Sequence, residues 1–245
     1  MGHSLVFYGG GRTLAPKERT ELPTSCWMHL SYVAQVLREL RPKSILDIGT
    51  GFGIYGFLAR DYLDVYQGRP YKETWEVNIE GIEAWEPYIS AVHRHVYDAV
   101  HIGDAVEAID TLGQFEMIIA GDVIEHFQRE KGENLIRKMI AHSSKWVLVS
   151  VPMGQDWPQE ASGGNPFQAH QSVWLQRDLS KMGFSLKEFR DENLRPYCVG
   201  LFTQNGVKSF DMAEVQAKEL YLAAQRKMPL LAVLRSGIRH LVQGR

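Results

Sequence analysis

The fold of this chain is decided by one stretch, Ser44-Ile45-Leu46-Asp47-Ile48-Gly49-Thr50-Gly51-Phe52-Gly53-Ile54-Tyr55-Gly56. It begins with an apolar run, which is typical of a strand buried inside a parallel sheet. Glycines at alternate positions follow, and they let the backbone turn tightly and approach a ligand without a Cβ in the way. The apolar residues after Gly53 predict a helix whose N-terminus points at whatever the loop holds. The stretch therefore predicts a strand, a loop and a helix that bind a nucleotide.

Two kinds of nucleotide site share such a loop. Gly51, Gly53 and Gly56 match G-x-G-x-x-G, which is typical of dinucleotide sites. Asp47, however, precedes Gly49 and extends the pattern to D-x-G-x-G-x-G. A carboxylate there would repel a pyrophosphate, whereas it suits a ligand with an ammonium and a sulfonium group. The pattern resembles the first motif of class I S-adenosylmethionine-dependent methyltransferases. The resemblance implies S-adenosylmethionine as cofactor, with contacts from Asp47, Gly49, Thr50, Gly51 and Gly53.

Carboxylates also end the next two predicted strands. Glu83 ends an apolar run, where its side chain can accept two hydrogen bonds from a ribose diol. An insertion at 64–74 moves Glu83 further from the loop than the about 20 residues expected of a dinucleotide site, and Glu86 is the alternative ribose ligand. A shorter run ends at Asp104, which suits the adenine amino group, while the N–H of Ala105 is available to the ring.

A second motif follows the predicted fourth strand over 115–121. It reads Asp122-Val123-Ile124-Glu125-His126 and resembles the motif after the fourth strand of class I methyltransferases. The resemblance implies that Asp122 lies beside the methionine moiety or the reacting methyl group. It covers residues 24 to about 203 and implies an α/β fold, a Rossmann-like, mostly parallel sheet of seven strands with an antiparallel C-terminal hairpin and helices on both faces.

The order of the motifs divides the chain into three parts. Residues 1–23 are expected to form an irregular N-terminal arm, and 24–208 the cofactor-binding domain, opening with a helix. Residues 209–245 are expected to form a helical tail. Its apolar face over 230–243 predicts contact with a membrane surface, a homodimer partner or its own domain.

Composition sets the class of protein. The chain has 245 residues, of which 44% are hydrophobic and 23% charged, as in a globular protein with one elaborated α/β domain or two small ones. A net charge of −2 gives no reason to expect a nucleic-acid partner. The two cysteines match no disulfide framework, the start lacks the features of a secretory signal, and no apolar run approaches ~18 residues. We therefore expect a cytoplasmic protein.

The long segment after the predicted fifth strand is expected to bind the methyl acceptor. It is rich in Gly, Pro and Asn, as in a substrate loop at the carboxyl edge of a sheet. Trp157, Phe167 and Trp174 offer stacking surfaces for a sugar ring or another planar group. The segment resembles a subgroup of bacterial methyltransferases linked to sugar or polysaccharide modification. The resemblance implies a small molecule or a glycan as acceptor.

An oxygen acceptor must lose a proton, and histidine titrates in the useful range. His170, in the presumed substrate loop, is the first candidate for the base, although it is also placed to cap the next helix. His126 is the second candidate and is expected mainly to orient the loop after Asp122. Asp122, His126 and His170 could together bind a divalent cation, but their spacing matches no metal-binding motif, so we expect no metal site.

Two other classes of protein remain open. An NAD-type oxidoreductase would use the same glycines, although Asp47, the preceding helix and the Asp-x-x-Glu-His motif all argue against it. A catalytically silent module would keep the cofactor site without turning over. Comparing the binding of S-adenosylmethionine with that of NAD distinguishes an oxidoreductase from a methyltransferase. A turnover assay distinguishes a silent module from an enzyme.

Overall fold

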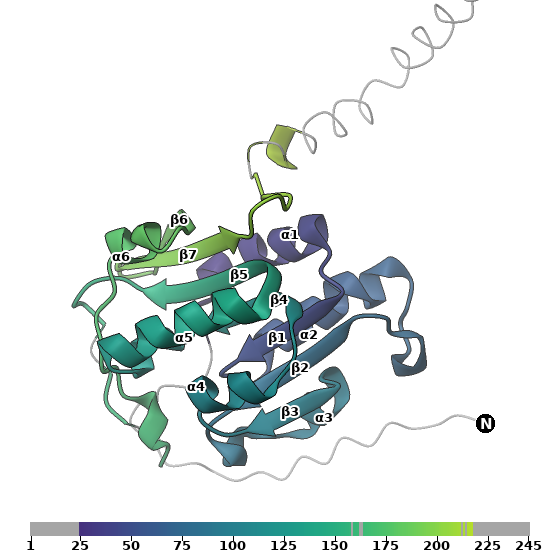
Figure 1. Ribbon diagram of the computed structural model, residues 1–245, viewed down its shortest axis with the longest axis horizontal. Helices are drawn as coiled ribbons and strands as arrows, with labels where there is room; N and C mark the ends of the chain where they lie inside the picture. The colour runs from purple at the N-terminus through teal and green to yellow at the C-terminus, as the bar shows by residue number, and fades with distance from the viewer. Residues whose placement is uncertain (1–24, 158, 162–163, 212, 214, 218–245) are drawn as a thin grey trace, which may run out of the picture.

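The computed structural model describes residues 25–157, 159–161, 164–211, 213 and 215–217 (Figure 1). The predicted N-terminal arm over 1–23 and the apolar tail face over 230–243 lie outside the described residues. Within the described part of the chain, no helix is both long and apolar enough to cross a membrane.

A seven-stranded sheet forms the centre of the molecule, in the order β3-β2-β1-β4-β5-β7-β6. The neighbours from β3 to β5 pair in parallel, whereas β7 runs antiparallel to both β5 and β6. This confirms the predicted α/β fold and its C-terminal hairpin. The strands are β1 Ser44–Ile48, β2 Asn78–Glu83, β3 Ala99–Ile102, β4 Phe115–Gly121, β5 Ser143–Pro152, β6 Ser185–Arg190 and β7 Pro196–Thr203.

Helices cover both faces of the sheet, as predicted (Figure 1). One apolar cluster packs α1, α2 and α3 on one face, and a second packs α4, α5 and α6 on the other. The helices are α1 Leu30–Leu40, α2 Ile54–Leu63, α3 Ala91–Val96, α4 Ala105–Ala108, α5 Arg129–His142 and α6 Gln176–Lys181. Short 3₁₀ turns lie at Trp27–His29, Val65–Gln67, Lys72–Thr74, Glu86–Tyr88, Ile109–Thr111, Ile124–His126 and Pro166–Gln168.

Strand β1 lies between the two clusters, which explains why its apolar residues point to both faces of the sheet. Ile45 packs with the cluster of α1 and α2, whereas Leu46 and Ile48 pack with that of α5, and all three are fully buried. A strand covered on both faces needs apolar residues at successive positions rather than at alternate ones. Because β1 lies between β2 and β4, the glycine loop that follows it begins near the middle of this edge of the sheet.

Two helices begin later than the sequence predicts, since the pattern places the first start at residues 23–25 and the last at 172–174. The first follows a 3₁₀ turn at Trp27–His29 and starts at Leu30, with no side-chain cap. The last starts at Gln176, so Trp174 precedes it in a bridge with Met153. Trp174 is fully buried, and the Arg129 guanidinium lies 3.9 Å from the centre of its ring. The predicted stacking role of Trp174 is therefore wrong, because its ring is fully buried beside Arg129 of α5.

Gly121 gives a test of packing at the end of β4. A Cβ there would overlap the ring of Tyr55, whose hydroxyl is held by His29 and Ser150 at 2.8 Å each. Since the buried ring cannot withdraw, Gly121→Ala should lower the free energy of unfolding by about 1–3 kcal/mol in urea denaturation. Gly113→Ala is the control, because its Cβ would meet nothing within 4 Å. Equal losses in the two variants would contradict this account.

Candidate functional site

A cavity of about 490 Å³ opens at the carboxyl ends of the parallel strands. Ligands of open α/β sheets bind at this edge. The cavity is lined by most of the residues predicted from the sequence: Gly49, Thr50, Gly51, Glu83, Asp104, Ala105, Asp122, His126 and His170. The structure therefore brings together the glycine loop and the histidines of the substrate loop. Asp47 and Gly53 are not among the described residues that line it.

The glycine loop is tied to the end of β2. Gly49 has a φ of +70°, and a Cβ at this position would overlap the side chain of Val123. The N–H groups of Gly49 and Thr50 donate to the carbonyl of Ile82 at 2.8 and 3.2 Å. Only glycine allows the turn and the close contact together. The loop is thus held in one shape at the mouth of the cavity.

Glu83 anchors this loop and also faces the cavity. Its Oε2 accepts from the N–H of Gly51 at 2.8 Å and the hydroxyl of Thr50 at 3.2 Å, and its Oε1 accepts from the N–H of Trp85 at 2.8 Å. Burial raises the pKa of Glu83, and these hydrogen bonds oppose the rise. The alternative ribose ligand, Glu86, is not among the described residues lining the cavity.

Asp104 occupies the next strand end and already has two partners. It accepts from the N–H of Val106 at 2.9 Å, as the N-cap of α4, and pairs with Lys131 at 2.6 Å. Lys131 also lines the cavity, which the sequence analysis did not foresee. The carboxylate is therefore fixed in position, with Ala105 beside it on the cavity wall.

Asp47 lies behind the loop rather than in the cavity. Residues i and i+2 of a strand share a face, so Asp47 points the same way as Ile45, towards α2 and α3. It is fully buried and accepts a hydrogen bond from the Tyr97 hydroxyl at 2.5 Å. Burial raises its pKa to about 7, although the bond from Tyr97 opposes this. The structure thus does not bring Asp47 to the predicted ligand site.

The raised pKa of Asp47 predicts a pH dependence of stability. Between its ordinary value of 3.8 and about 7, the folded chain holds a proton there that the unfolded chain has lost. The free energy of unfolding should therefore fall as pH rises through this range. Asn keeps the oxygen that Tyr97 needs and carries no charge. Asp47→Asn should be the more stable protein at pH 8 by about 1–3 kcal/mol.

Urea denaturation of both proteins at pH 4 and pH 8 checks this expectation. The test uses the difference in the free energy of unfolding between the two proteins. Other buried groups, including Glu83 beside Asp47, titrate in both of them. A stability difference that is the same at the two pH values would show that Asp47 does not hold the proton.

Asp122 follows β4 with a left-handed backbone, at a φ of +54°. It accepts a hydrogen bond from the Tyr197 hydroxyl at 2.5 Å, and burial raises its pKa to about 6. The Tyr197 ring stacks on that of His29, with the ring centres 4.6 Å apart. Packing from β7 and from the chain before α1 thus holds Asp122 at the cavity wall.

Glu125, like Lys131, is a cavity residue that was not predicted from the sequence. It lines the cavity and is 2% exposed, and neither of its carboxylate oxygens has a hydrogen-bond partner among the described residues. Burial and the nearby charge of Asp122 raise its pKa well above the ordinary value. The motif that contains Glu125 is visible in the sequence, but the turn at Ile124–His126 directs this side chain toward the cavity.

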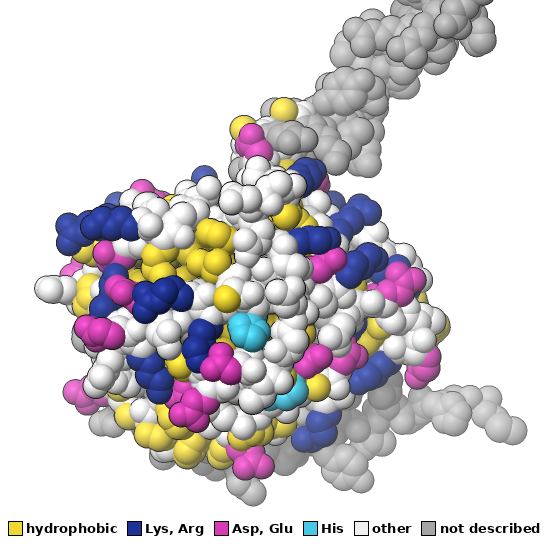
Figure 2. Space-filling model, viewed as in Figure 1, with side chains coloured by type: hydrophobic (Ala, Val, Ile, Leu, Met, Phe, Trp, Pro, Cys, Tyr) yellow, Lys and Arg dark blue, Asp and Glu magenta, His cyan; other side chains and the backbone are white. Residues whose placement is uncertain are grey.

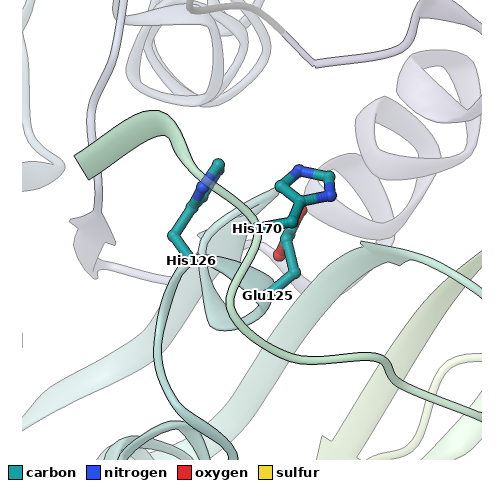
Figure 3. Close-up of side chains that lie close together, drawn as sticks. All are labelled: Glu125, His126 and His170. Atoms are coloured by element: carbon teal, nitrogen blue, oxygen red, sulfur yellow. The ribbon is translucent and has the colours of Figure 1, made fainter. Parts of the chain in front are cut away.

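The two histidines meet beside Glu125 (Figure 3). The ring centres of His126 and His170 are 4.9 Å apart, at 70° to each other. One atom from each imidazole and one from the Glu125 carboxylate all lie within 4.8 Å of one another. Burial and the neighbouring His170 lower the pKa of His126 to about 4, so its imidazole is neutral at pH 7. His170 does not cap the last helix, whose N-cap is Leu175.

Two aromatic residues of the predicted acceptor loop also line the cavity. The indole N–H of Trp157 donates to the carbonyl of Pro196 at 3.0 Å, and the Arg195 guanidinium lies 3.8 Å from the centre of its ring. Phe167 is 47% exposed, so its ring is available to a ligand. Two of the three predicted stacking residues are therefore at the site.

Comparison with known proteins identifies the fold. No protein-family model and no curated protein matches the chain. Among solved structures, TehB from Haemophilus influenzae is similar at 14% identity and a TM-score of 0.51, over 71% of this chain and 62% of that chain. A SAM-dependent methyltransferase from Archaeoglobus fulgidus is similar at 14% identity and a TM-score of 0.50, over 71% and 94%. This chain thus spans 62% of TehB. It has the fold of class I S-adenosylmethionine-dependent methyltransferases.

Proposed function

We propose that the chain transfers a methyl group from S-adenosylmethionine to a hydroxyl group of a small molecule or a glycan. One observation carries this proposal. A single cavity is lined both by the glycine loop with its anchoring carboxylate, Glu83, and by the histidine pair of His126 and His170. Such a cavity holds a nucleoside beside groups that can remove a proton.

The residues fit the proposed cofactor. Glu83 suits the ribose hydroxyls, Asp104 and Ala105 suit the adenine, and Asp122 suits the positively charged methionine end. S-adenosylmethionine supplies a methyl group on a positively charged sulfur. The chain's task is to align the acceptor with that methyl group, and most of the rate comes from this alignment.

Proton removal is assigned to His170. Its Nδ1 lies 2.7 Å from the carbonyl oxygen of Trp157, which can only accept, so Nδ1 carries the hydrogen in the neutral ring. The Nε2 atom then has a lone pair for the proton of an acceptor hydroxyl. A base in this position contributes about 10²–10⁴ in rate.

The acceptor class rests on the loop between β5 and α6. Trp157 and Phe167 give apolar faces on which a sugar ring can lie. The resemblance of this loop to bacterial sugar-modifying methyltransferases points the same way. On the face in Figure 2, positive and negative side chains are interspersed, which does not favour a nucleic acid as acceptor.

Calorimetry with the full chain tests the proposal. S-adenosylmethionine and its demethylated product should each bind one per chain, and NAD should not bind. The chain should then form the demethylated product when sugars or small alcohols are supplied as acceptors. Binding of NAD in place of S-adenosylmethionine would overturn the proposal in favour of an oxidoreductase.

A further inference from the structure

The Glu125 carboxyl group is buried without a polar partner among the described residues. It is 2% exposed, and no described residue donates a hydrogen bond or forms an ion pair with it. Burying a carboxylate without a partner is costly, and a second acid, Asp122, lies nearby. Because the carboxyl group faces the cavity, a ligand can supply the missing partner. A metal cation is a partner that a buried carboxylate can take.

Both neighbouring imidazoles have the hydrogen-bonding pattern of metal-binding histidines. Nδ1 of His170 lies 2.7 Å from the Trp157 carbonyl, and Nδ1 of His126 lies 3.3 Å from the Ala169 carbonyl. Since a carbonyl can only accept, each ring donates from Nδ1 and keeps a lone pair on Nε2. Histidine ligands of metals are oriented in this way, with the other nitrogen bonded to a backbone carbonyl or a carboxylate.

We propose that Glu125, His126 and His170 together bind a divalent transition-metal ion. Bonds from such an ion to nitrogen and oxygen are about 2.0–2.2 Å long, so two ligand atoms on one ion lie at most about 4.4 Å apart. One atom of each side chain already lies within 4.8 Å of the others, and small side-chain rotations close the difference. Two imidazoles select Zn²⁺, Fe²⁺, Co²⁺ or Ni²⁺ rather than Mg²⁺ or Ca²⁺.

The proposed site has the form of a catalytic rather than a structural metal site. It has three protein ligands, which leaves at least one position for an oxygen of the acceptor. All three ligands line the cavity, so that position is open to it. The carboxylate that completes the site is Glu125, whereas the sequence pattern offers Asp122 in this place and predicts no metal.

The ion changes how the acceptor loses its proton, and this consequence rests on the proposed function. A hydroxyl bound to the ion becomes more acidic, and its proton leaves to solvent water. The oxygen then forms a bond to the methyl carbon, the carbon–sulfur bond breaks, and its electron pair neutralises the positive sulfur. With the ion bound, His170 is a ligand and the proton goes to water, whereas in the metal-free chain His170 accepts the proton itself. Metal binding as such does not depend on the proposed function.

The test uses the untagged full chain, freed of metal by a chelator and titrated with Zn²⁺ by calorimetry and with Co²⁺ by visible absorption. We expect one ion per chain. Glu125→Gln and His170→Ala should each weaken Zn²⁺ binding. Removing a group that hydrogen-bonds to a metal ligand already costs about 10–100-fold in affinity, so removing the ligand itself should cost more. His101→Ala is the matched control, because His101 also contacts a carboxylate, that of Glu80 at 2.8 Å, but away from the cavity. It should bind Zn²⁺ like the wild type.

S-adenosylmethionine binding by each variant shows that its fold is intact. His170→Asn replaces His170→Ala if the latter does not fold. The inference is overturned if the wild type binds no stoichiometric Zn²⁺ or Co²⁺, or if the folded double variant Glu125→Gln/His170→Ala binds as much as the wild type. A chain that binds S-adenosylmethionine but no metal overturns this inference alone. A chain that binds metal but no S-adenosylmethionine overturns the proposed function alone.

Discussion

His170→Ala is expected to lower the turnover number by about 10²–10⁴-fold and to leave the affinity for S-adenosylmethionine near that of the wild type. The imidazole lines the cavity, and its ring lone pair lies on Nε2, because Nδ1 donates to the Trp157 carbonyl. It takes no part in the hydrogen bonds that fix the glycine loop, which are made by Glu83 and Ile82. Loss of the ring should therefore affect the reaction rather than cofactor binding.

Formation of the demethylated product measures this turnover, and calorimetry measures the affinity. If His170 accepts the proton directly, activity of the variant should partly return at high pH, where hydroxide is available. His101→Ala should keep full turnover. Undiminished turnover of His170→Ala would contradict the assignment, and loss of cofactor binding would show that the loop acts as a lid instead.

Glu83→Ala is expected to weaken S-adenosylmethionine binding by about 1–3 kcal/mol, or about 5–150-fold. The variant loses the charged hydrogen bonds that we assign to the ribose. It also releases the N–H of Gly51 and the hydroxyl of Thr50, which Glu83 holds at 2.8 and 3.2 Å. Both effects act in the same direction, because the free loop must be ordered again when the cofactor binds.

Glu86→Ala is the matched control for this measurement. Glu86 is a carboxylate of the same chain segment, but it does not belong to the described cavity lining. Calorimetry should give it the affinity of the wild type. If Glu83→Ala bound as tightly as the wild type, the ribose assignment would be wrong, and an equal loss in both variants would mean that charge alone, rather than contact, is responsible.

The sheet could be predicted from the sequence because its strands leave a strong pattern. Apolar residues at successive positions, such as Ile45 and Leu46, mark strands covered on both faces, and the glycines after β1 mark where the chain must turn beside a ligand. The carboxyl ends of parallel strands meet at one edge. Residues at or just after the strand ends, such as Glu83 and Asp122, were therefore expected to lie together, and they line one cavity.

The direction of individual side chains could not be predicted in the same way. Asp47 occurs in the motif of a cofactor site, yet strand alternation turns it towards Tyr97, inside the protein. Trp174 lies in the acceptor segment but packs on α5. Glu125 lies between Asp122 and His126 in the second motif, and only the 3₁₀ turn at Ile124–His126 brings its carboxyl group to His170. In each case tertiary packing, rather than local sequence, decides which face the residue meets.

The most direct test of the central claim is a crystal structure of the full chain with the demethylated cofactor, S-adenosylhomocysteine. We expect the ribose hydroxyls within hydrogen-bond distance of Glu83, the amino acid end beside Asp122, and the sulfur facing His126 and His170. This arrangement would place the methyl group of the true cofactor next to the acceptor. A ligand whose sulfur points away from the histidines, or that binds outside this cavity, would contradict the proposal that this chain is a methyltransferase.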